Sequence, residues 1–119
     1  MNDIRLGEVE SIFADIIWEN EPLTPGELFK LAAEKLEWKR QTTDTVLKRL
    51  CDKGIFKKEG KTISSLISRD EFYARQSEKL INDAFEGSLP AFLAAFGSRK
   101  KLSEDEIDEL KAVIENMRR

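Results

Sequence analysis

Residues 41–64 decide the fold, and they read QTTDTVLKRLCDKGIFKKEGKTIS. Their first half predicts a helix over residues 41–53, because the side chains that can pack recur at i, i+3, i+4 and i+7. These positions are Thr43, Val46, Leu47 and Leu50. The opposite face is polar and holds Gln41, Thr45, Lys48 and Asp52. The helix therefore has one face for a core and another that offers short hydroxyls, an amide and a cation to a partner.

A change of period after Gly54 predicts a two-stranded hairpin. Gly54 suits the left-handed residue that ends many helices. Residues 55–58 and 61–64 are then short stretches on either side of Glu59-Gly60, and glycine accommodates the positive φ of a tight turn.

Two more helices are expected before this segment. The first covers residues 7–20 and has one apolar stripe, made of Val9, Ile12, Phe13 and Ile16. The second begins after Thr24, with Pro25 at its first position and Glu27 completing a capping box. Three helices followed by a hairpin are typical of a winged helix-turn-helix, in which residues 24–53 are the two-helix motif.

The rest of the chain is expected to be helical. A helix over residues 69–86 is followed by a short apolar helix from Leu89, a polar link over residues 97–101 and a last helix from Ser103. Ser103 and Glu106 form a second capping box. The fold class is thus mainly α with a small β-hairpin, a winged helix-turn-helix DNA-binding domain over residues 1–68 and a C-terminal helical dimerisation segment over residues 69–119.

The C-terminal segment needs a partner, because about 50 residues are too few to bury these apolar faces alone. An identical chain is the simplest partner and gives a two-fold homodimer. The residues expected at this dimerisation surface are Phe72, Leu80, Leu89, Phe92, Leu93, Phe96, Ile107, Leu110 and Ile114.

Composition argues against catalysis and for an intracellular protein. The chain has no histidine and one cysteine, Cys51, so neither an ordinary zinc site nor a cysteine–histidine nucleophile can form within it. No metal or cofactor is expected, and an enzyme that uses carboxylates or lysines is the weakest of the alternatives. The sequence has no apolar run of membrane-spanning length and no signal peptide, which predicts a cytoplasmic protein without membrane insertion.

The charge is distributed unevenly. The net charge is −3, but residues 38–61 contain eight basic and three acidic side chains. A local basic stripe matters more for DNA binding than total charge, because the groups that touch phosphates determine how many counterions are released. This stretch favours double-stranded operator DNA as the partner.

The residues expected to bind DNA differ in role. Arg40 and Gln41 suit guanine and adenine edges, and Thr42 and Thr45 suit bases or thymine methyl groups. The others are expected to bind phosphates, and they are Lys48, Arg49, Lys57, Lys58 and Lys61. Two alternatives remain open: a winged-helix adaptor that binds proteins through the same face and does not bind DNA, and a solvated surface with charge pairs four residues apart.

At many of these residues the sequence also resembles the penicillinase-repressor (BlaI/MecI-type) family of winged-helix transcriptional regulators. The matching fragments span almost the whole chain. They are Leu6-Gly7-Glu8-Val9-Glu10, Ile17-Trp18, Pro22-Leu23-Thr24, Trp38, Thr42, Thr45, Leu47, Arg49-Leu50, Lys53-Gly54, Gly87-Ser88-Leu89, Phe92-Leu93, Phe96, Leu102-Ser103, Glu106-Ile107 and Glu109-Leu110.

The resemblance implies a homodimeric repressor that binds an inverted-repeat operator. It also implies a membrane sensor-protease system that signals cleavage of the repressor at an Asn-Phe bond. The matching positions here are Ala95 and Phe96, so the asparagine is absent.

Overall fold

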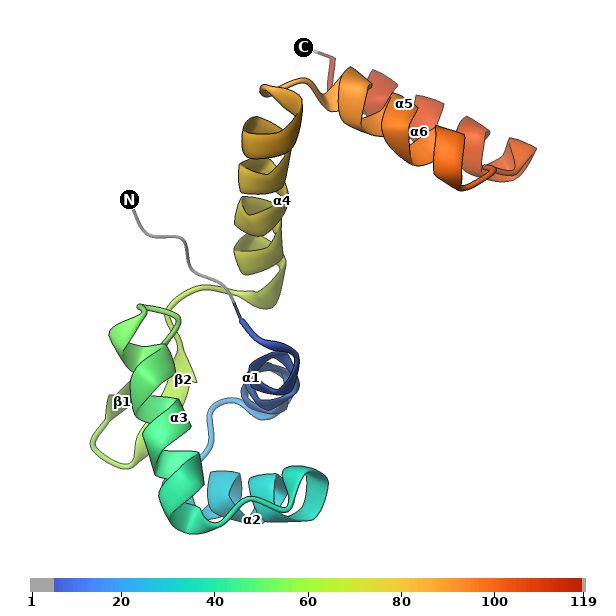
Figure 1. Ribbon diagram of the computed structural model, residues 1–119. Coiled ribbons are helices and arrows are strands. Elements are labelled where there is room, and N and C mark those ends of the chain that lie inside the picture. Colours follow the sequence, from blue (N-terminus) through green and yellow to red (C-terminus); the bar gives the residue numbers. More distant parts are fainter. Residues whose placement is uncertain (1–5, 119) are drawn as a thin grey trace. The chain divides into compact units, whose positions relative to one another are not determined.

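The computed structural model describes residues 6–118, and this part of the chain contains six helices and one two-stranded sheet (Figure 1). In chain order the elements are α1 (Glu8–Asn20), α2 (Pro25–Leu36), α3 (Arg40–Asp52), β1 (Phe56–Glu59), β2 (Thr62–Ser65), α4 (Arg69–Phe85), α5 (Leu89–Arg99) and α6 (Glu104–Asn116). The expected fold class, mainly α with a small hairpin, is confirmed. None of the helices within residues 6–118 is long and apolar enough to cross a membrane.

The chain divides into two compact units, Met1–Ser77 and Glu78–Arg119. The division falls inside α4, later than the boundary after residue 68 that the sequence suggested. The start of α4 belongs to the first unit because Phe72 is packed into that unit's core. A functional boundary at residue 68 stays a prediction.

The first unit is a winged helix. Strands β1 and β2 pair antiparallel, with Phe56 opposite Ser65 and Glu59 opposite Thr62. Leu23 forms an isolated antiparallel bridge with Ile63 of β2, and the two residues exchange backbone hydrogen bonds of 3.1 and 2.8 Å. The core between the helices and this sheet consists of Phe13, Ala14, Ile16, Ile17, Leu23, Leu28, Ala32, Val46, Leu47, Leu50, Ile55, Phe56, Ile63 and Phe72.

The buried face of α1 differs from the expected stripe. Phe13 and Ile16 are buried, but Val9 is 49% and Ile12 46% exposed, while Ala14 and Ile17 are buried instead. The prediction was wrong for Val9 and Ile12, because the part of α1 that the core buries lies within residues 13–17, and α2 and β2 are elements that pack on this helix. Helical spacing identifies positions on one face but not the part of the helix that its neighbours cover.

The start of α2 forms as its sequence predicts. The Thr24 hydroxyl accepts a 3.2 Å hydrogen bond from the backbone N–H of Glu27, and the Glu27 carboxylate accepts one of 2.8 Å from the N–H of Thr24. Pro25 occupies the first helical position. This reciprocal pair satisfies two N–H groups that a helix start otherwise leaves unpaired.

The hairpin begins one residue later than expected. Ile55 lies in the turn that follows α3 and not in β1, because its N–H donates to the Leu50 carbonyl at 3.1 Å. Gly54 has φ +83° and Gly60 φ +60°, the left-handed conformation that glycine adopts without strain.

Trp18 fastens the chain before α4 to the winged helix. Its indole Nε1–H donates to the Ile67 carbonyl at 3.0 Å, and its ring lies 5.2 Å from the ring of Phe56 and 5.7 Å from that of Phe72. Arg69 adds a second link, because its Nε lies 2.7 Å from an Asp15 carboxylate oxygen. The start of α4 is therefore fixed to α1.

We expect Trp18→Phe to lower the free energy of unfolding by about 1–3 kcal/mol more than Trp38→Phe does, because it leaves the Ile67 carbonyl without its donor. Trp38 is a matched control, since its ring packs 5.1 Å from that of Phe13 and the same atoms are removed. Urea denaturation followed by circular dichroism measures both variants. Equal losses would mean that the hydrogen bond contributes nothing.

The second unit has well-formed helices, and none of its described residues, 78–118, is buried. Ser103 and Glu106 form the expected capping box at 3.1 and 3.0 Å, and the Ser88 hydroxyl caps α5 by accepting from the N–H of Ala91 at 3.0 Å. Helix α5 continues to Arg99, so the expected polar link is shorter than predicted. Ser98 supports this extension by donating its hydroxyl to the Ala95 carbonyl at 2.8 Å.

Candidate nucleic-acid interface

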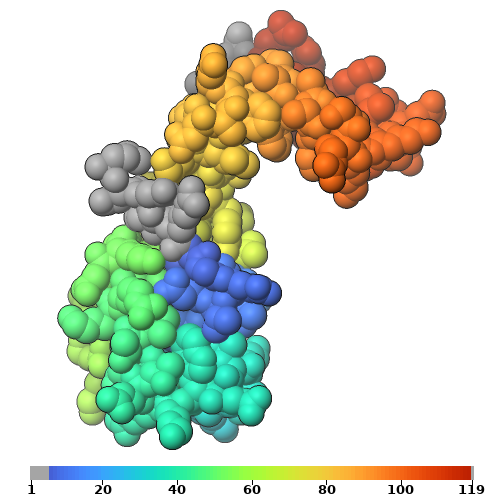
Figure 2. Space-filling model, viewed as in Figure 1, coloured from blue at the N-terminus to red at the C-terminus, as the bar shows by residue number. Residues whose placement is uncertain are grey.

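Helix α3 has the two faces that its sequence predicts. Thr43, Val46, Leu47 and Leu50 are buried, and the Thr43 hydroxyl donates to the Lys39 carbonyl at 3.1 Å, so its burial leaves no unpaired donor. Figure 2 shows α3, in green, on the surface of the first unit. The residues expected to contact DNA from this helix are all exposed, and they are Arg40, Gln41, Thr42, Thr45, Lys48 and Arg49.

A shallow hollow of about 330 Å³ lies along the outer side of α3. Lys39, Gln41, Thr42, Thr45, Val46 and Arg49 line it. Five of these six side chains are polar or cationic, and Thr45 is fixed by donating its hydroxyl to the Gln41 carbonyl at 3.0 Å. Such a surface can receive hydrogen-bonding groups that carry negative charge.

The first turn of α3 favours an anion. Unlike α2 and α6, it has no side-chain cap and no acidic residue, and it begins at Lys39-Arg40. The N–H groups of a helix start and its dipole add positive potential there. Arg40 is steadied by Phe29, because its guanidinium carbon lies 4.7 Å from the centroid of that ring.

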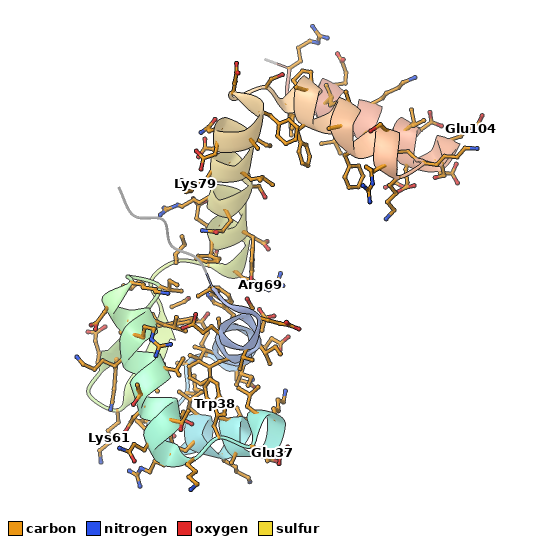
Figure 3. The ribbon with its side chains drawn as sticks, viewed as in Figure 1. Glu37, Trp38, Lys61, Arg69, Lys79 and Glu104 are labelled. Atoms are coloured by element: carbon orange, nitrogen blue, oxygen red, sulfur yellow. The ribbon has the colours of Figure 1, made fainter. Side chains whose placement is uncertain are left out.

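The other expected phosphate-binding lysines come from the end of α3 and from the hairpin. Lys58 and Lys61 are exposed, and Figure 3 shows Lys61 at the hairpin turn. Lys57 is half-buried and pairs with Glu59 at 2.6 Å, which lowers the pKa of the Glu59 carboxyl. Lys48 lies 3.9 Å from Asp52, as their spacing of four residues suggested.

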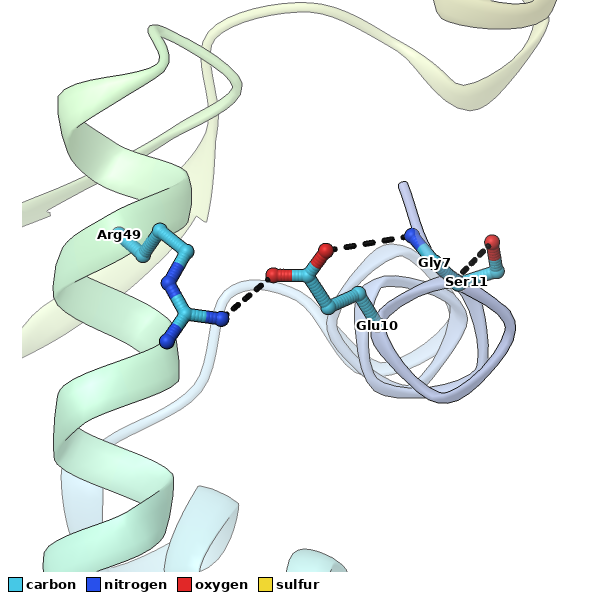
Figure 4. A network of polar contacts seen from close by, with 4 residues as sticks. All are labelled: Gly7, Glu10, Ser11 and Arg49. Carbon is cyan, nitrogen blue, oxygen red and sulfur yellow. Dashed lines mark hydrogen bonds and ion pairs between the residues drawn. The ribbon is translucent and has the colours of Figure 1, made fainter. Parts of the chain in front are cut away.

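Arg49 has a partner that sequence reasoning missed. Its Nη1 lies 2.9 Å from Glu10 Oε2, and Glu10 Oε1 accepts a 3.2 Å hydrogen bond from the Gly7 N–H (Figure 4). The Arg49 hydrogen bond, followed by that of Gly7, holds the pKa of Glu10 below its ordinary value despite partial burial. Because 39 residues separate the pair, no local pattern could have indicated it.

Comparison with known proteins identifies the family of this chain. A model of the penicillinase repressor family matches residues 6–116. The chain belongs to the penicillinase repressor family. Among its relatives, the methicillin resistance regulatory protein MecI of Staphylococcus aureus is 26% identical over 114 residues, which are 92% of this chain and 93% of the relative. The penicillinase repressor of Bacillus licheniformis is 25% identical over 115 residues, 93% of this chain and 90% of the relative.

Membership of the penicillinase repressor family confirms the resemblance seen in the sequence. It places the chain among repressors and not in an enzyme class. Within residues 6–118, no cluster of three or more Cys, Asp or Glu side chains is arranged to hold a metal ion. Burial raises the pKa of the Cys51 thiol, so this cysteine is a packing residue of α3 and not an activated thiolate.

The C-terminal unit of this penicillinase repressor family member exposes an apolar surface. No residue of α5 or α6 is buried. A groove of about 450 Å³ separates the two helices, and its lining consists of Phe92, Leu93, Phe96, Leu102, Glu106, Glu109, Leu110 and Val113. Phe92 stacks near Phe96 at 6.2 Å and meets Phe85 edge-on at 5.5 Å.

The structure sorts the residues expected at the dimer surface into two groups. Exposed or half-buried in the second unit are Leu80, Leu89, Phe92, Leu93, Phe96, Ile107, Leu110 and Ile114. Phe72 is different, because it is 3% exposed and packs in the first unit's core beside Trp18. The spacing of apolar residues along α4 could not reveal this. It does not distinguish a side chain that packs within its own chain from one that packs against a second copy. The expectation that Phe72 belongs to a dimer surface is therefore corrected, because this side chain is buried within the first unit.

Proposed function

We propose that this chain is a dimeric transcriptional repressor that binds an inverted-repeat operator through α3 and the hairpin. The observation that supports this most is the outer side of α3, where cations, hydroxyls and an amide surround an open hollow while the helix is held from behind by the core. The family match supports the same function, since the relatives are named as regulators and repressors.

In this proposal α3 lies in the major groove. Arg40 and Gln41 contact base edges, and Thr42 and Thr45 contact bases or thymine methyl groups. The remaining cations contact phosphates and fix the register, and they are Lys48, Arg49, Lys57, Lys58 and Lys61. Two copies place their α3 helices in successive major grooves, about 34 Å apart.

The second copy is proposed because no residue of α5 or α6 is buried in the single chain, although both helices have apolar side chains. Phe96, which lines the groove, and Ile107 and Ile114 on α6 are all exposed. Pairing of the same surface from two chains buries it symmetrically, which is the commonest form of a stable oligomer. Dimerisation in turn matches the symmetry of an inverted repeat.

Proteolytic release by a sensor-protease is left out of the proposal. The bond between Ala95 and Phe96 lacks the asparagine that the family resemblance calls for, and it lies inside α5. Repression by occupying a promoter requires no cleavage.

Titration of labelled duplexes from the protein's own promoter region tests the proposed function. With five phosphate-binding cations per protomer, log affinity should fall with log salt concentration with a slope of about −4 to −5 per protomer. Fluorescence anisotropy at several salt concentrations measures the slope. Absent or salt-insensitive binding would contradict the proposal. A protein partner that is lost when the outer face of α3 is changed would instead support an adaptor.

A further inference from the structure

Glu10 joins the start of α1 to the side of α3 that faces the proposed DNA. One of its carboxylate oxygens accepts from the Gly7 N–H at 3.2 Å, while the other lies 2.9 Å from Arg49 Nη1 (Figure 4). The Glu10 side chain is only 19% exposed, whereas that of Arg49 is 52% exposed. The carboxylate is thus fixed in the protein, and the guanidinium extends from it toward solvent.

Arg49 also lines the hollow beside Thr42 and Thr45. A guanidinium has five N–H donors in one plane, and its bond to Glu10 uses one of them. The same group can therefore bind Glu10 at one edge and a phosphate oxygen at another. This planar set of donors is a usual reason for arginine at a phosphate contact.

We propose that Glu10 is a positioning residue that orients Arg49 toward a backbone phosphate of the bound DNA. The inference rests on the proposed function. An unrestrained arginine loses several rotamers when it is immobilised in an interface, and that loss weakens binding. An arginine that Glu10 already holds loses fewer rotamers when DNA binds.

Charge alone predicts the opposite sign. Glu10 is a carboxylate near a polyanion, so its neutralisation should strengthen DNA binding if the residue acts only through its charge. If the residue positions Arg49, its neutralisation should weaken binding. The direction of the change therefore separates the two roles.

The variant Glu10→Gln is suited to this test, because the glutamine side-chain oxygen can still accept the Gly7 N–H that Glu10 accepts. Glu8→Gln is the matched control, since it removes the same charge from the same helical turn. A labelled duplex of arbitrary sequence, about 30 base pairs long and at low salt, serves as the probe because phosphate contacts do not depend on sequence. Thermal unfolding checks that both variants fold.

We expect Glu10→Gln to weaken binding by about 5-fold or more for the dimer, and Glu8→Gln to leave it equal or slightly tighter. In an Arg49→Ala background, Glu10→Gln should cause no further weakening, because the residue it positions is gone. A merely structural role for Glu10 would weaken binding in both backgrounds.

Binding by Glu10→Gln that equals or exceeds that of the native protein would overturn the inference, as would equal weakening in the Arg49→Ala background. Neither result would affect the proposed function, which the native protein tests by itself. If the native protein bound no duplex at any salt concentration, the proposed function and this inference would both fall.

Discussion

Replacing Phe96 and Ile114 by aspartate is expected to convert the protein into a monomer and to weaken operator binding by about 10²- to 10⁴-fold. Phe96 lies on α5 and Ile114 on α6, and both are exposed in the single chain. A carboxylate at either position would be desolvated without a partner when two copies associate. Loss of the dimer removes the second α3 from the operator, so each half-site binds independently.

Ala112→Asp is the control for this experiment. Ala112 is exposed on α6, and the helical period places it opposite Ile107 and Ile114. It adds a negative charge to the same helix without touching the apolar face. Sedimentation equilibrium gives the oligomeric state, circular dichroism gives the helix content, and anisotropy gives the affinity. A double variant that remained dimeric, or a monomer with native affinity, would contradict the proposed assembly.

Replacing Lys57, Lys58 and Lys61 by glutamine is expected to make the salt dependence of DNA binding shallower by about 2.7 slope units per protomer. Each lysine contributes one phosphate contact in the proposed complex, and each contact releases about 0.9 of a counterion. Because phosphates have no sequence information, operator and unrelated DNA should lose affinity by similar factors. The ratio between the two affinities should therefore stay close to its native value.

The matched control replaces Lys30, Lys35 and Lys101, which are exposed on α2 and in the link between α5 and α6. It makes the same change in net charge away from the hairpin and from the outer face of α3. A control variant with an equally shallow slope would show that total charge, and not contact by the hairpin, governs binding. A hairpin variant that lost operator selectivity would contradict the assignment of these lysines to phosphates.

The sequence predicted well those parts of the fold that depend on residues within about one helical turn of each other. The capping boxes at Thr24 and Ser103 form as expected, because residues three positions apart meet at any helix start. The two faces of α3 were also predicted, because a period of 3.6 residues per turn places Val46 and Leu50 on one face and Gln41 and Lys48 on another. These features required no knowledge of the remaining chain.

The errors came where an apolar side chain had more than one possible neighbour. Phe72 suited either a dimer surface or a core, and only the packing of Trp18 against it decided for the core. Val9 and Ile12 suited a buried stripe, but they are 49% and 46% exposed, and the buried residues of α1 lie within residues 13–17. Hydrophobicity indicates that burial is favourable and does not identify the surface that supplies it.

The amino-acid sequence by itself therefore determined the kind of protein: helices with polar or apolar faces, a hairpin after Gly54, a basic stretch over residues 38–61, and an apolar C-terminal segment. Only the tertiary structure decided which distant groups meet, as Glu10 does with Arg49 and Trp18 with the Ile67 carbonyl. The physical reason is that periodicity and capping act along one helix, whereas an ion pair across 39 residues exists only after α1 and α3 have packed.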